Sequence, residues 1–221
     1  MTNGRKTIHI VKDHYENTAW QANQLVLGID EVGRGCLCGP LVCAAVILHP
    51  NKKSRKLKDS KLLDKHELQD GYNWIVKNSW YEVAISHHRF IDQHNIYQAT
   101  LRTMHRAVMQ LIAKIGKNPD LILVDALPLK VTEIPVMNFP HGEKKSSTIA
   151  AASIIAKVTR DIIMQRLEPI IPGYYMGQHK GYATKLHLDS LTLHGQSFIH
   201  RKSFLKKINQ IDDEKEQQTL W

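Results

Sequence analysis

The 221-residue sequence has few cysteines, few aromatic residues and no long apolar run. Its three cysteines, Cys36, Cys38 and Cys43, lie within eight positions, and no second cysteine pair completes a zinc site, so we expect small buried side chains. The apolar runs are far too short to span a bilayer, and the polar N-terminal segment does not resemble a signal peptide. These absences predict a globular cytoplasmic protein without a membrane partner.

Basic residues outnumber acidic ones, with 30 Lys and Arg against 21 Asp and Glu, for a net charge of +9 with histidine neutral. The length and the 43% hydrophobic content allow one large α/β domain or two small ones with a proper core. A basic surface attracts a phosphodiester backbone over long range, but charge that only aids solubility would look the same in the sequence.

The most informative stretch is a short apolar run, residues 25–29, that ends on the adjacent carboxylates Asp30 and Glu31. The glycine-arginine loop, residues 33–35, follows directly. We expect a buried strand with two acids at its end, beside backbone free to approach a ligand and a guanidinium able to bind phosphate. Carboxylates next to phosphate favour Mg²⁺ or Mn²⁺. The alternative is a solvated strand end with an ordinary tight turn.

A second apolar run, residues 121–124, ends in the same way on Asp125. If the two strands are parallel, Asp30, Glu31 and Asp125 share one edge of a sheet, where ligands of open α/β sheets gather. Like charges this close raise each other's pKa unless a cation neutralises them, so the cluster favours a divalent metal.

The remaining pattern alternates between strands and helices. It predicts strands at residues 41–48 and 80–86, and helices at residues 64–78, opened by Asp64, and at about residues 90–115. Loops join these segments, and the basic loop at residues 52–58 is expected to be a solvated charge run. This alternation is typical of the α/β class.

Two later segments have features that suit nucleic acid. Ser146 and Ser147 predict the start of a helix over residues 148–167, where free N–H groups could hold a phosphate. Residues 173–184 combine tyrosines, glycines and basic residues, a mixture that stacks on sugars and bases, although an ordinary surface loop accounts for it about as well.

Five separated segments, in this order, resemble those of the bacterial type 2 ribonucleases H, and the likeness extends from about residue 15 to residue 204. They are residues 28–35, 59–61, 124–125, 149–161 and 179–182. The resemblance implies an α/β ribonuclease H-like fold: a mixed five-stranded sheet flanked by helices, with a helical C-terminal part. It places a catalytic domain at residues 23–208, between an N-terminal extension at 1–22 and a polar, mobile tail at 209–221.

The resemblance further implies four carboxylates that bind two divalent ions, Mg²⁺ or Mn²⁺. Asp30, Glu31 and Asp125 match three of them. Relatives usually have Asp in a Lys-Gly-Asp segment as the fourth, and this chain has His-Gly-Glu there, so Glu143 is expected to take that place with a longer reach. Asp161 is the alternative, although we expect it to form a structural ion pair.

The implied activity is that of an endonuclease that hydrolyses the RNA strand of RNA–DNA hybrids. By resemblance it also cuts 5′ to single ribonucleotides embedded in duplex DNA, by two-metal-ion catalysis, and leaves 3′-hydroxyl and 5′-phosphate ends. Its partners would be these hybrids and ribonucleotide-containing duplexes, and we expect a monomer. The implied substrate contacts are the 2′-hydroxyl for Gly33, Arg34 and Gly35, the following deoxyribose for Tyr182, and phosphates for Lys61, Ser153 and Lys157.

This chain departs from the family pattern at Ala126, where relatives often have glycine, and at Cys36 and Cys38, which replace the commoner proline and alanine. We expect only local effects on the turns. Three alternatives stay open: a type 3 ribonuclease H, which typically has an added N-terminal domain and lacks the Gly-Arg-Gly sequence, a non-catalytic binder of hybrids, and a structural protein with a chance acidic edge.

Overall fold

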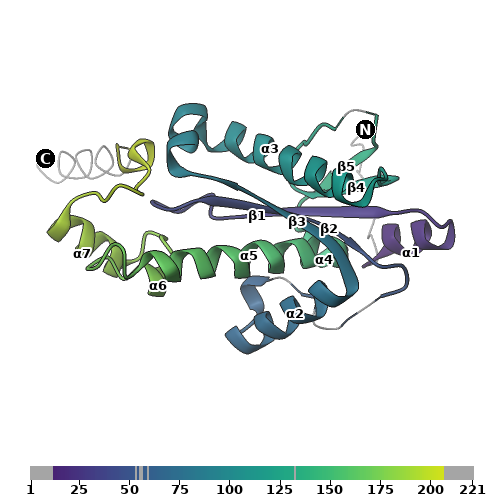
Figure 1. The fold of residues 1–221 in the computed structure, drawn as a ribbon, viewed down its shortest axis with the longest axis horizontal. Helices are drawn as coiled ribbons and strands as arrows, with labels where there is room; N and C mark the ends of the chain where they lie inside the picture. The colour runs from purple at the N-terminus through teal and green to yellow at the C-terminus, as the bar shows by residue number, and fades with distance from the viewer. Residues whose placement is uncertain (1–11, 53, 55–56, 59, 132, 207–221) are drawn as a thin grey trace, which may run out of the picture.

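A five-stranded mixed sheet forms the centre of the computed structural model, which describes residues 12–52, 54, 57–58, 60–131 and 133–206 (Figure 1). The strands are β1 (Val26–Val32), β2 (Leu41–Leu48), β3 (Ser79–Ser86), β4 (Leu121–Asp125) and β5 (Val136–Phe139), in the order β3-β2-β1-β4-β5. β1, β2 and β3 are antiparallel neighbours, whereas β4 is parallel to β1 and β5 is parallel to β4. The expected α/β class and mixed sheet are confirmed.

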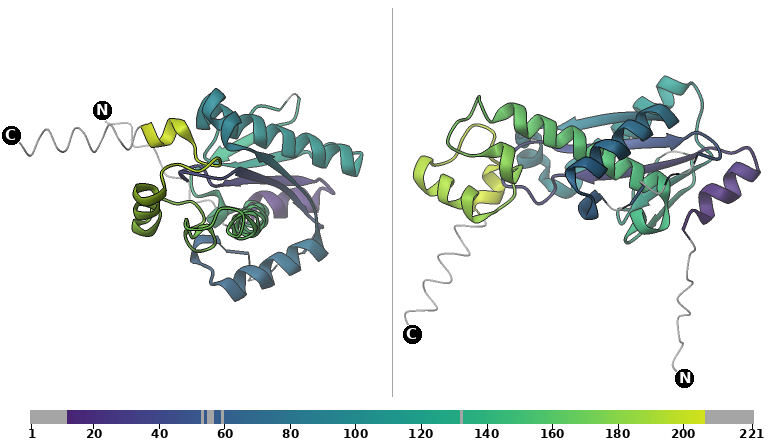
Figure 2. Two further views of the ribbon diagram at one scale, coloured as in Figure 1. Left: turned by 60° about the vertical axis from the view of Figure 1, so that its left-hand side comes forward. Right: turned by 90° about the horizontal axis from the view of Figure 1, so that it is seen from below.

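Helices cover both faces of this sheet and extend beyond one end of it. The helices are α1 (His14–Gln21), the short 3-10 helix η1 (Ser60–Leu62), α2 (Lys65–Asn78), α3 (His88–Ile115), α4 (Gly142–Lys145), α5 (Ser147–Leu167), α6 (Met176–His179) and α7 (Lys185–His194). α3 lies on one face, and α5 with α2 lies on the other (Figures 1 and 2). α6 and α7 form the helical C-terminal part beyond one end of the sheet.

The core consists of two layers, one on each face of the sheet. β2 contributes alternate side chains to both, and all eight of its residues are buried. Burial on both faces explains why its sequence is an unbroken apolar run. On β1, a Cβ at Gly28 would lie 2.4 Å from the carbonyl carbon of Thr148, so glycine allows α5 to pack directly against the strand that carries the acids.

Most of the predicted elements are confirmed. The Asp64 side chain accepts a hydrogen bond from the backbone N–H of Glu67 at 2.8 Å, and Glu67 returns one, which forms a capping box at the start of α2. α3 ends at Ile115 and is capped by Gly116, whose φ is +67°. The three cysteines are free and buried, as expected.

The start and kink of α3 and the strand β5 are among the local features that were not predicted. α3 begins at His88 and is kinked at Asn95, whose φ of +59° interrupts the helix, although the apolar periodicity continues through it. β5 lies between β4 and α4, in a stretch that contains Pro128, Pro135 and Pro140 and for which no strand was predicted. This strand has only four residues, and its short sequence has no alternation that distinguishes it from loop.

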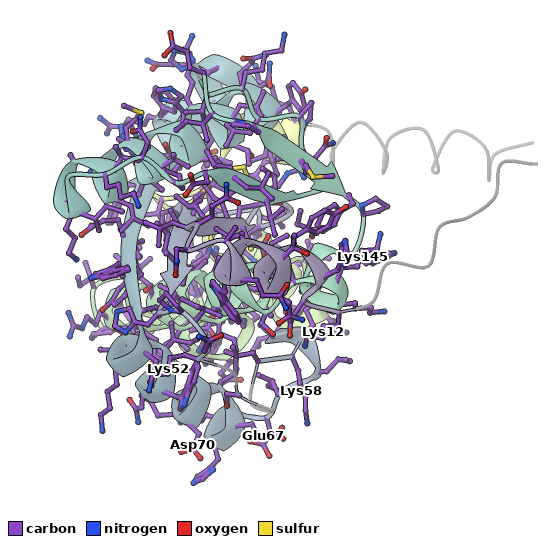
Figure 3. The ribbon with its side chains drawn as sticks, turned by 90° about the vertical axis from the view of Figure 1, so that its right-hand side faces the viewer. Lys12, Lys52, Lys58, Glu67, Asp70 and Lys145 are labelled. Carbon is purple, nitrogen blue, oxygen red and sulfur yellow. The ribbon has the colours of Figure 1, made fainter. Side chains whose placement is uncertain are left out.

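The basic segment between β2 and α2 contacts its neighbours at two described positions, which Figure 3 shows from the side of α1 and α2. Lys12 Nζ donates to the Leu57 carbonyl at 2.8 Å, and Lys58 Nζ lies 3.9 Å from a carboxylate oxygen of Glu67. Lys52 is exposed, as expected. The expected tail at 209–221 lies outside the described residues, and so do Asp59 and residues 1–11 of the expected N-terminal extension.

No helix in the described ranges has the length and apolar character required to cross a membrane.

Candidate active site

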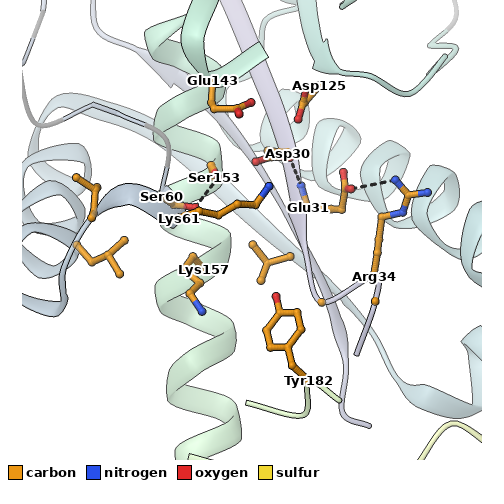
Figure 4. A pocket seen from close by; sticks show the side chains of 15 residues that line it. Asp30, Glu31, Arg34, Ser60, Lys61, Asp125, Glu143, Ser153, Lys157 and Tyr182 are labelled. Carbon is orange, nitrogen blue, oxygen red and sulfur yellow. Dashed lines mark hydrogen bonds and ion pairs between the residues drawn. The ribbon is translucent and has the colours of Figure 1, made fainter. Parts of the chain in front are cut away.

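One cavity of about 630 Å³ opens at the carboxyl ends of β1 and β4 (Figure 4). Every candidate site residue from the sequence except Asp161, the alternative fourth carboxylate, lines it, together with Val32, Ser60, Leu63 and Leu68. Residues from six separate segments therefore meet at one place, which is the edge where the two parallel strands end.

Four carboxylates enter the cavity from three elements. β1 supplies Asp30 and Glu31, and the adjacent parallel strand β4 supplies Asp125. Asp125 Oδ1 accepts a hydrogen bond of 2.8 Å from the backbone N–H of Gly142, the first residue of α4. This bond holds α4 against the end of β4 and brings Glu143, the next residue, to the same cavity.

Burial and mutual repulsion raise the pKa values of Asp30 and Glu31 in this cluster. Burial, with further contributions from Glu31 and Asp125, raises the pKa of Asp30 well above its ordinary value. Burial raises the pKa of Glu31 to about 7, even though Arg34 Nη1 lies 3.3 Å from its Oε1 and opposes the shift. In the free protein these two carboxyl groups therefore retain protons more readily than exposed acids do.

The donor set fits a divalent cation. Glu31 Oε2 is a buried oxygen with no hydrogen-bond partner within the described part of the chain, and such an oxygen is costly unless a cation or water contacts it. Carboxylate oxygens are also the ligands that Mg²⁺ and Mn²⁺ prefer. Asp30, Glu31, Asp125 and Glu143 are the residues that would hold the ions.

The polar wall of the cavity comes from η1 and α5. Ser60 and Ser153 share a hydrogen bond of 2.9 Å between their hydroxyl oxygens, which fixes η1 against α5. Lys61, the next residue of η1, points its amine toward the carboxylates (Figure 4). Ser153 also hydrogen-bonds to Asp30 and opposes the rise in its pKa.

Of the two candidates for the fourth carboxylate, only Glu143 lines the cavity. Asp161 lies further along α5, and its Oδ1 is 3.0 Å from Lys157 Nζ. The expected ion pair of Asp161 is confirmed, and the geometry favours Glu143.

The glycine-arginine loop and Tyr182 form the opposite wall. The Tyr182 hydroxyl points into the cavity (Figure 4), and its ring centroid lies 6.0 Å from Lys157 Nζ. The residue is 39% exposed, so part of it is accessible to a ligand. Burial raises the pKa of the Tyr182 hydroxyl to about 12, so this group stays a neutral hydrogen-bond donor at physiological pH.

A comparison with protein-family models matches ribonuclease HII over residues 27–207, which contain the whole cavity. The chain belongs to the ribonuclease HII family. It is 43% identical over 197 residues to a ribonuclease HII of Alkaliphilus metalliredigens, covering 87% of this chain and 96% of that one. It is 42% identical over 191 residues to a ribonuclease HII of Lactobacillus acidophilus, covering 86% of this chain and 74% of that one.

Solved structures agree with this assignment. Ribonuclease H2 of Pyrococcus horikoshii superposes with a TM-score of 0.68 at 25% identity, covering 84% of this chain and 97% of that chain. The ribonuclease HII of Archaeoglobus fulgidus, solved in a complex with PCNA, gives a TM-score of 0.65 at 25% identity, covering 80% and 94%. The fold is therefore that of ribonuclease HII, and the chain is an enzyme of the ribonuclease H type.

The suggestion that free N–H groups at the start of α5 could hold a phosphate is wrong, because these groups already have partners. The Ser146 hydroxyl accepts from the Ile149 N–H at 3.1 Å, and Asp13 Oδ1 accepts from the Ser147 N–H at 2.7 Å. Glu16 Oε1 accepts from the Thr148 N–H at 3.1 Å and is itself buried. Side chains of the segment that carries α1 thus already satisfy the N–H groups that an anion would need.

A buried histidine pair lies beneath Tyr182. His187 Nδ1 is 2.9 Å from the Tyr182 carbonyl oxygen, so this nitrogen carries the proton and donates it. His200 Nδ1 accepts from the backbone N–H of Ser197 at 2.8 Å, so its proton is on Nε2, which lies 3.0 Å from His187 Nε2. Both rings are neutral. Cys38 Sγ is close to them, but the protonated Nε2 of His200 does not suit a metal ligand.

Several supporting residues could not be found from the sequence as parts of the site. Ser60 lies in a matched segment, but nothing in the sequence indicates its hydrogen bond to Ser153. Asp13 and Glu16 lie more than 120 positions from α5, the helix that they cap. Arg160 lies inside the α5 segment, and Arg201 follows the last matched segment with no local pattern to mark it. Their contacts depend on the tertiary structure alone.

Proposed function

We propose that this ribonuclease H hydrolyses the RNA strand of RNA–DNA hybrids and cuts 5′ to single ribonucleotides embedded in duplex DNA. The observation that supports it best is that four carboxylates, the glycine-arginine loop and Tyr182 line the same cavity. The carboxylates suit phosphodiester hydrolysis, and the loop and ring suit reading of the sugar beside the cut. We also propose that the protein acts as a monomer.

The proposed cofactors are two divalent ions, Mg²⁺ or Mn²⁺, held by Asp30, Glu31, Asp125 and Glu143. When bound, such ions supply an activated water and neutralise the charge of the phosphate during in-line displacement, leaving 3′-hydroxyl and 5′-phosphate ends. The chain's own part is to hold four carboxylates together on rigid elements. Glu31 contributes a buried oxygen without a hydrogen-bond partner among the described residues, which is consistent with a ligand role.

The basic and polar side chains of the cavity are proposed to bind the substrate backbone. Lys61 and Lys157 both line the cavity, and Lys61 points its ammonium group toward the carboxylates, where phosphates of the substrate would approach. The backbone of the glycine-arginine loop is proposed to contact the 2′-hydroxyl, the group that distinguishes RNA from DNA at a given position. Tyr182 is proposed to stack on the deoxyribose that follows.

The first test is cleavage of a labelled DNA duplex that contains one ribonucleotide, in Mg²⁺, in Mn²⁺ and in chelator. We expect a metal-dependent cut immediately 5′ to the ribonucleotide, mapped at nucleotide resolution. Cleavage of a long hybrid with no cut at the single ribonucleotide would contradict the proposed specificity. Binding to both substrates without cleavage of either would favour a non-catalytic hybrid binder.

The replacement Asp125→Asn tests the carboxylate cluster. We expect cleavage to fall by much more than about a hundredfold, because a direct ligand contributes more than the outer partners whose loss costs 10–100-fold. Substrate affinity, measured by fluorescence anisotropy, should change little. The matched control is Asp120→Asn at the other end of β4, where the side chain accepts from the Leu25 N–H at 2.8 Å and lies outside the cavity. Equal activity of the two variants would contradict the assignment.

A further inference from the structure

Two arginines, Arg160 on α5 and Arg201 near the end of the described chain, are fully buried. Within the described residues neither guanidinium forms an ion pair with a carboxylate. Their donors are directed instead to backbone carbonyl groups. A buried charge without a counter-ion is costly, and only several good hydrogen bonds can offset that cost. The carbonyl groups that these two arginines bind therefore indicate what the arginines do.

Arg160 joins two segments that are far apart in the sequence. Its Nε donates to the Pro40 carbonyl at 2.9 Å and its Nη2 to the Cys38 carbonyl at 3.2 Å, both in the segment that continues the glycine-arginine loop. Its Nη1 donates to the Lys180 carbonyl at 2.7 Å, two residues before Tyr182. One planar group thus links the two segments that form this wall of the cavity.

Arg201 holds the same loop from the other side. Its Nη1 donates to the Arg34 carbonyl at 2.9 Å, and its Nη2 and Nε donate to the Gly39 carbonyl at 3.0 and 3.2 Å. Its backbone N–H also donates to the Leu37 carbonyl at 2.8 Å. The two arginines therefore fix the loop at Arg34 and across residues 38–40, with no regular secondary structure in between.

The glycine-arginine loop is shaped around Arg160. Gly33 has φ of +96°, and a Cβ there would lie 2.3 Å from Arg160 Nε, so only glycine allows the loop to pass over the guanidinium. The Tyr182 ring centroid lies 5.8 Å from the same guanidinium carbon. Arg160 is therefore in close proximity to both groups that are proposed to read the sugars.

We propose that Arg160 and Arg201 are positioning residues that set the separation between the glycine-arginine loop and Tyr182, so that a ribonucleotide and the sugar after it are recognised as one unit. This inference rests on the proposed function. A planar guanidinium with five donors can fix three carbonyl groups in one arrangement, whereas a lysine ammonium has no fixed fork. The arginines act on specificity and leave the carboxylate cluster unchanged.

The test compares Arg160→Lys and Arg201→Lys with the unmodified enzyme on two substrates, a duplex with one ribonucleotide and a uniform RNA–DNA hybrid. For each variant we expect the ratio of kcat/KM on the first substrate to kcat/KM on the second to fall at least tenfold. The matched control is Arg166→Lys, an exposed position on the same helix, which should keep the ratio of the unmodified enzyme. An equal loss on both substrates, or no change in the ratio, would overturn the proposal.

A second measurement applies even if one lysine variant is unstable. Tyr182→Ala and Arg201→Lys are combined, and the effect of the arginine change on the single-ribonucleotide duplex is measured with and without the tyrosine. If Arg201 acts through the position of the loop relative to Tyr182, its effect shrinks at least threefold in the Tyr182→Ala background. Independent effects would contradict positioning. Failure of the unmodified enzyme to cut the single-ribonucleotide duplex would instead refute the proposed function itself.

Discussion

At the scale of single residues, Ala126 is in an unusual conformation directly after the proposed ligand Asp125. Its φ is +57°, in the left-handed region that an alanine side chain disfavours. Relatives often have glycine at this place, and we expected only a small local effect of the change. The structure gives the reason why glycine suits the turn between β4 and the segment that leads to β5.

The replacement Ala126→Gly should stabilise the fold by about 1 kcal/mol, because it removes the steric cost of a left-handed alanine. Denaturant unfolding measures this change, and cleavage activity should be unaffected. Ala113→Gly, at an exposed position inside α3, is the matched control and should lose about 0.5–1 kcal/mol. An Ala126→Gly protein no more stable than the parent would show that the strain is relieved elsewhere in the turn.

At the scale of elements, the start of α5 depends on α1. α1 lies outside the 23–208 domain expected from the sequence, yet Asp13 and Glu16 accept hydrogen bonds from the first N–H groups of α5. The same end of α5 follows directly after α4, which carries Glu143. The N-terminal segment therefore supports the part of the chain that delivers the fourth carboxylate.

Ser146→Ala should destabilise the protein by about 1–2 kcal/mol, the upper part of the range for loss of a helix cap. The Ser146 hydroxyl accepts from the Ile149 N–H at 3.1 Å and donates to buried Glu16, so two partners are lost at once. Thermal or urea unfolding provides the measurement. Asp64→Ala removes the exposed cap of α2 and should cost less. Equal losses would indicate that the Glu16 contact contributes nothing.

At the scale of the whole molecule, the His187–His200 pair makes stability depend on pH. Burial lowers the pKa of both histidines to about 4, from 6.5 for an exposed histidine. Between these values the unfolded chain binds more protons than the native protein, so the free energy of unfolding falls as pH decreases from 6.5 to about 4. Each histidine contributes up to about 1.4 kcal/mol per pH unit in that window.

The variant His200→Asn should therefore show a shallower loss of stability than the parent between pH 6.5 and about 4. Urea unfolding at several pH values, without added metal, provides the measurement. Asp30 and Glu31 have raised pKa values and act in the opposite direction, so the informative quantity is the difference between variant and parent. His66→Asn, at an exposed position on α2, should leave the pH profile unchanged. If both variants follow the pH profile of the parent, the His187–His200 pair does not cause the loss of stability at acid pH.

The sequence by itself determined the elements that have a strong local pattern and the residues that gather at the site. β1, β2 and β4 are buried strands, and strands buried on both faces need apolar side chains throughout, so each is recognised in the sequence as an apolar run. Asp30, Glu31 and Asp125 stand at strand ends, and they share one edge because the structure pairs β1 and β4 in parallel. Glu143 required the family resemblance, because a lone acid in a loop has no periodicity to mark it.

The tertiary structure alone decided how the site is supported. The four-residue strand β5, the kink at Asn95 and the left-handed Ala126 depend on packing that overrides weak local preferences. The phosphate expected at α5 is excluded because side chains from the segment that carries α1 already occupy its N–H groups. Arg160 and Arg201 acquire their partners only when the glycine-arginine loop and the Tyr182 turn meet around them. Local sequence specifies propensity and chemistry, whereas contacts between distant segments are fixed only by the folded chain.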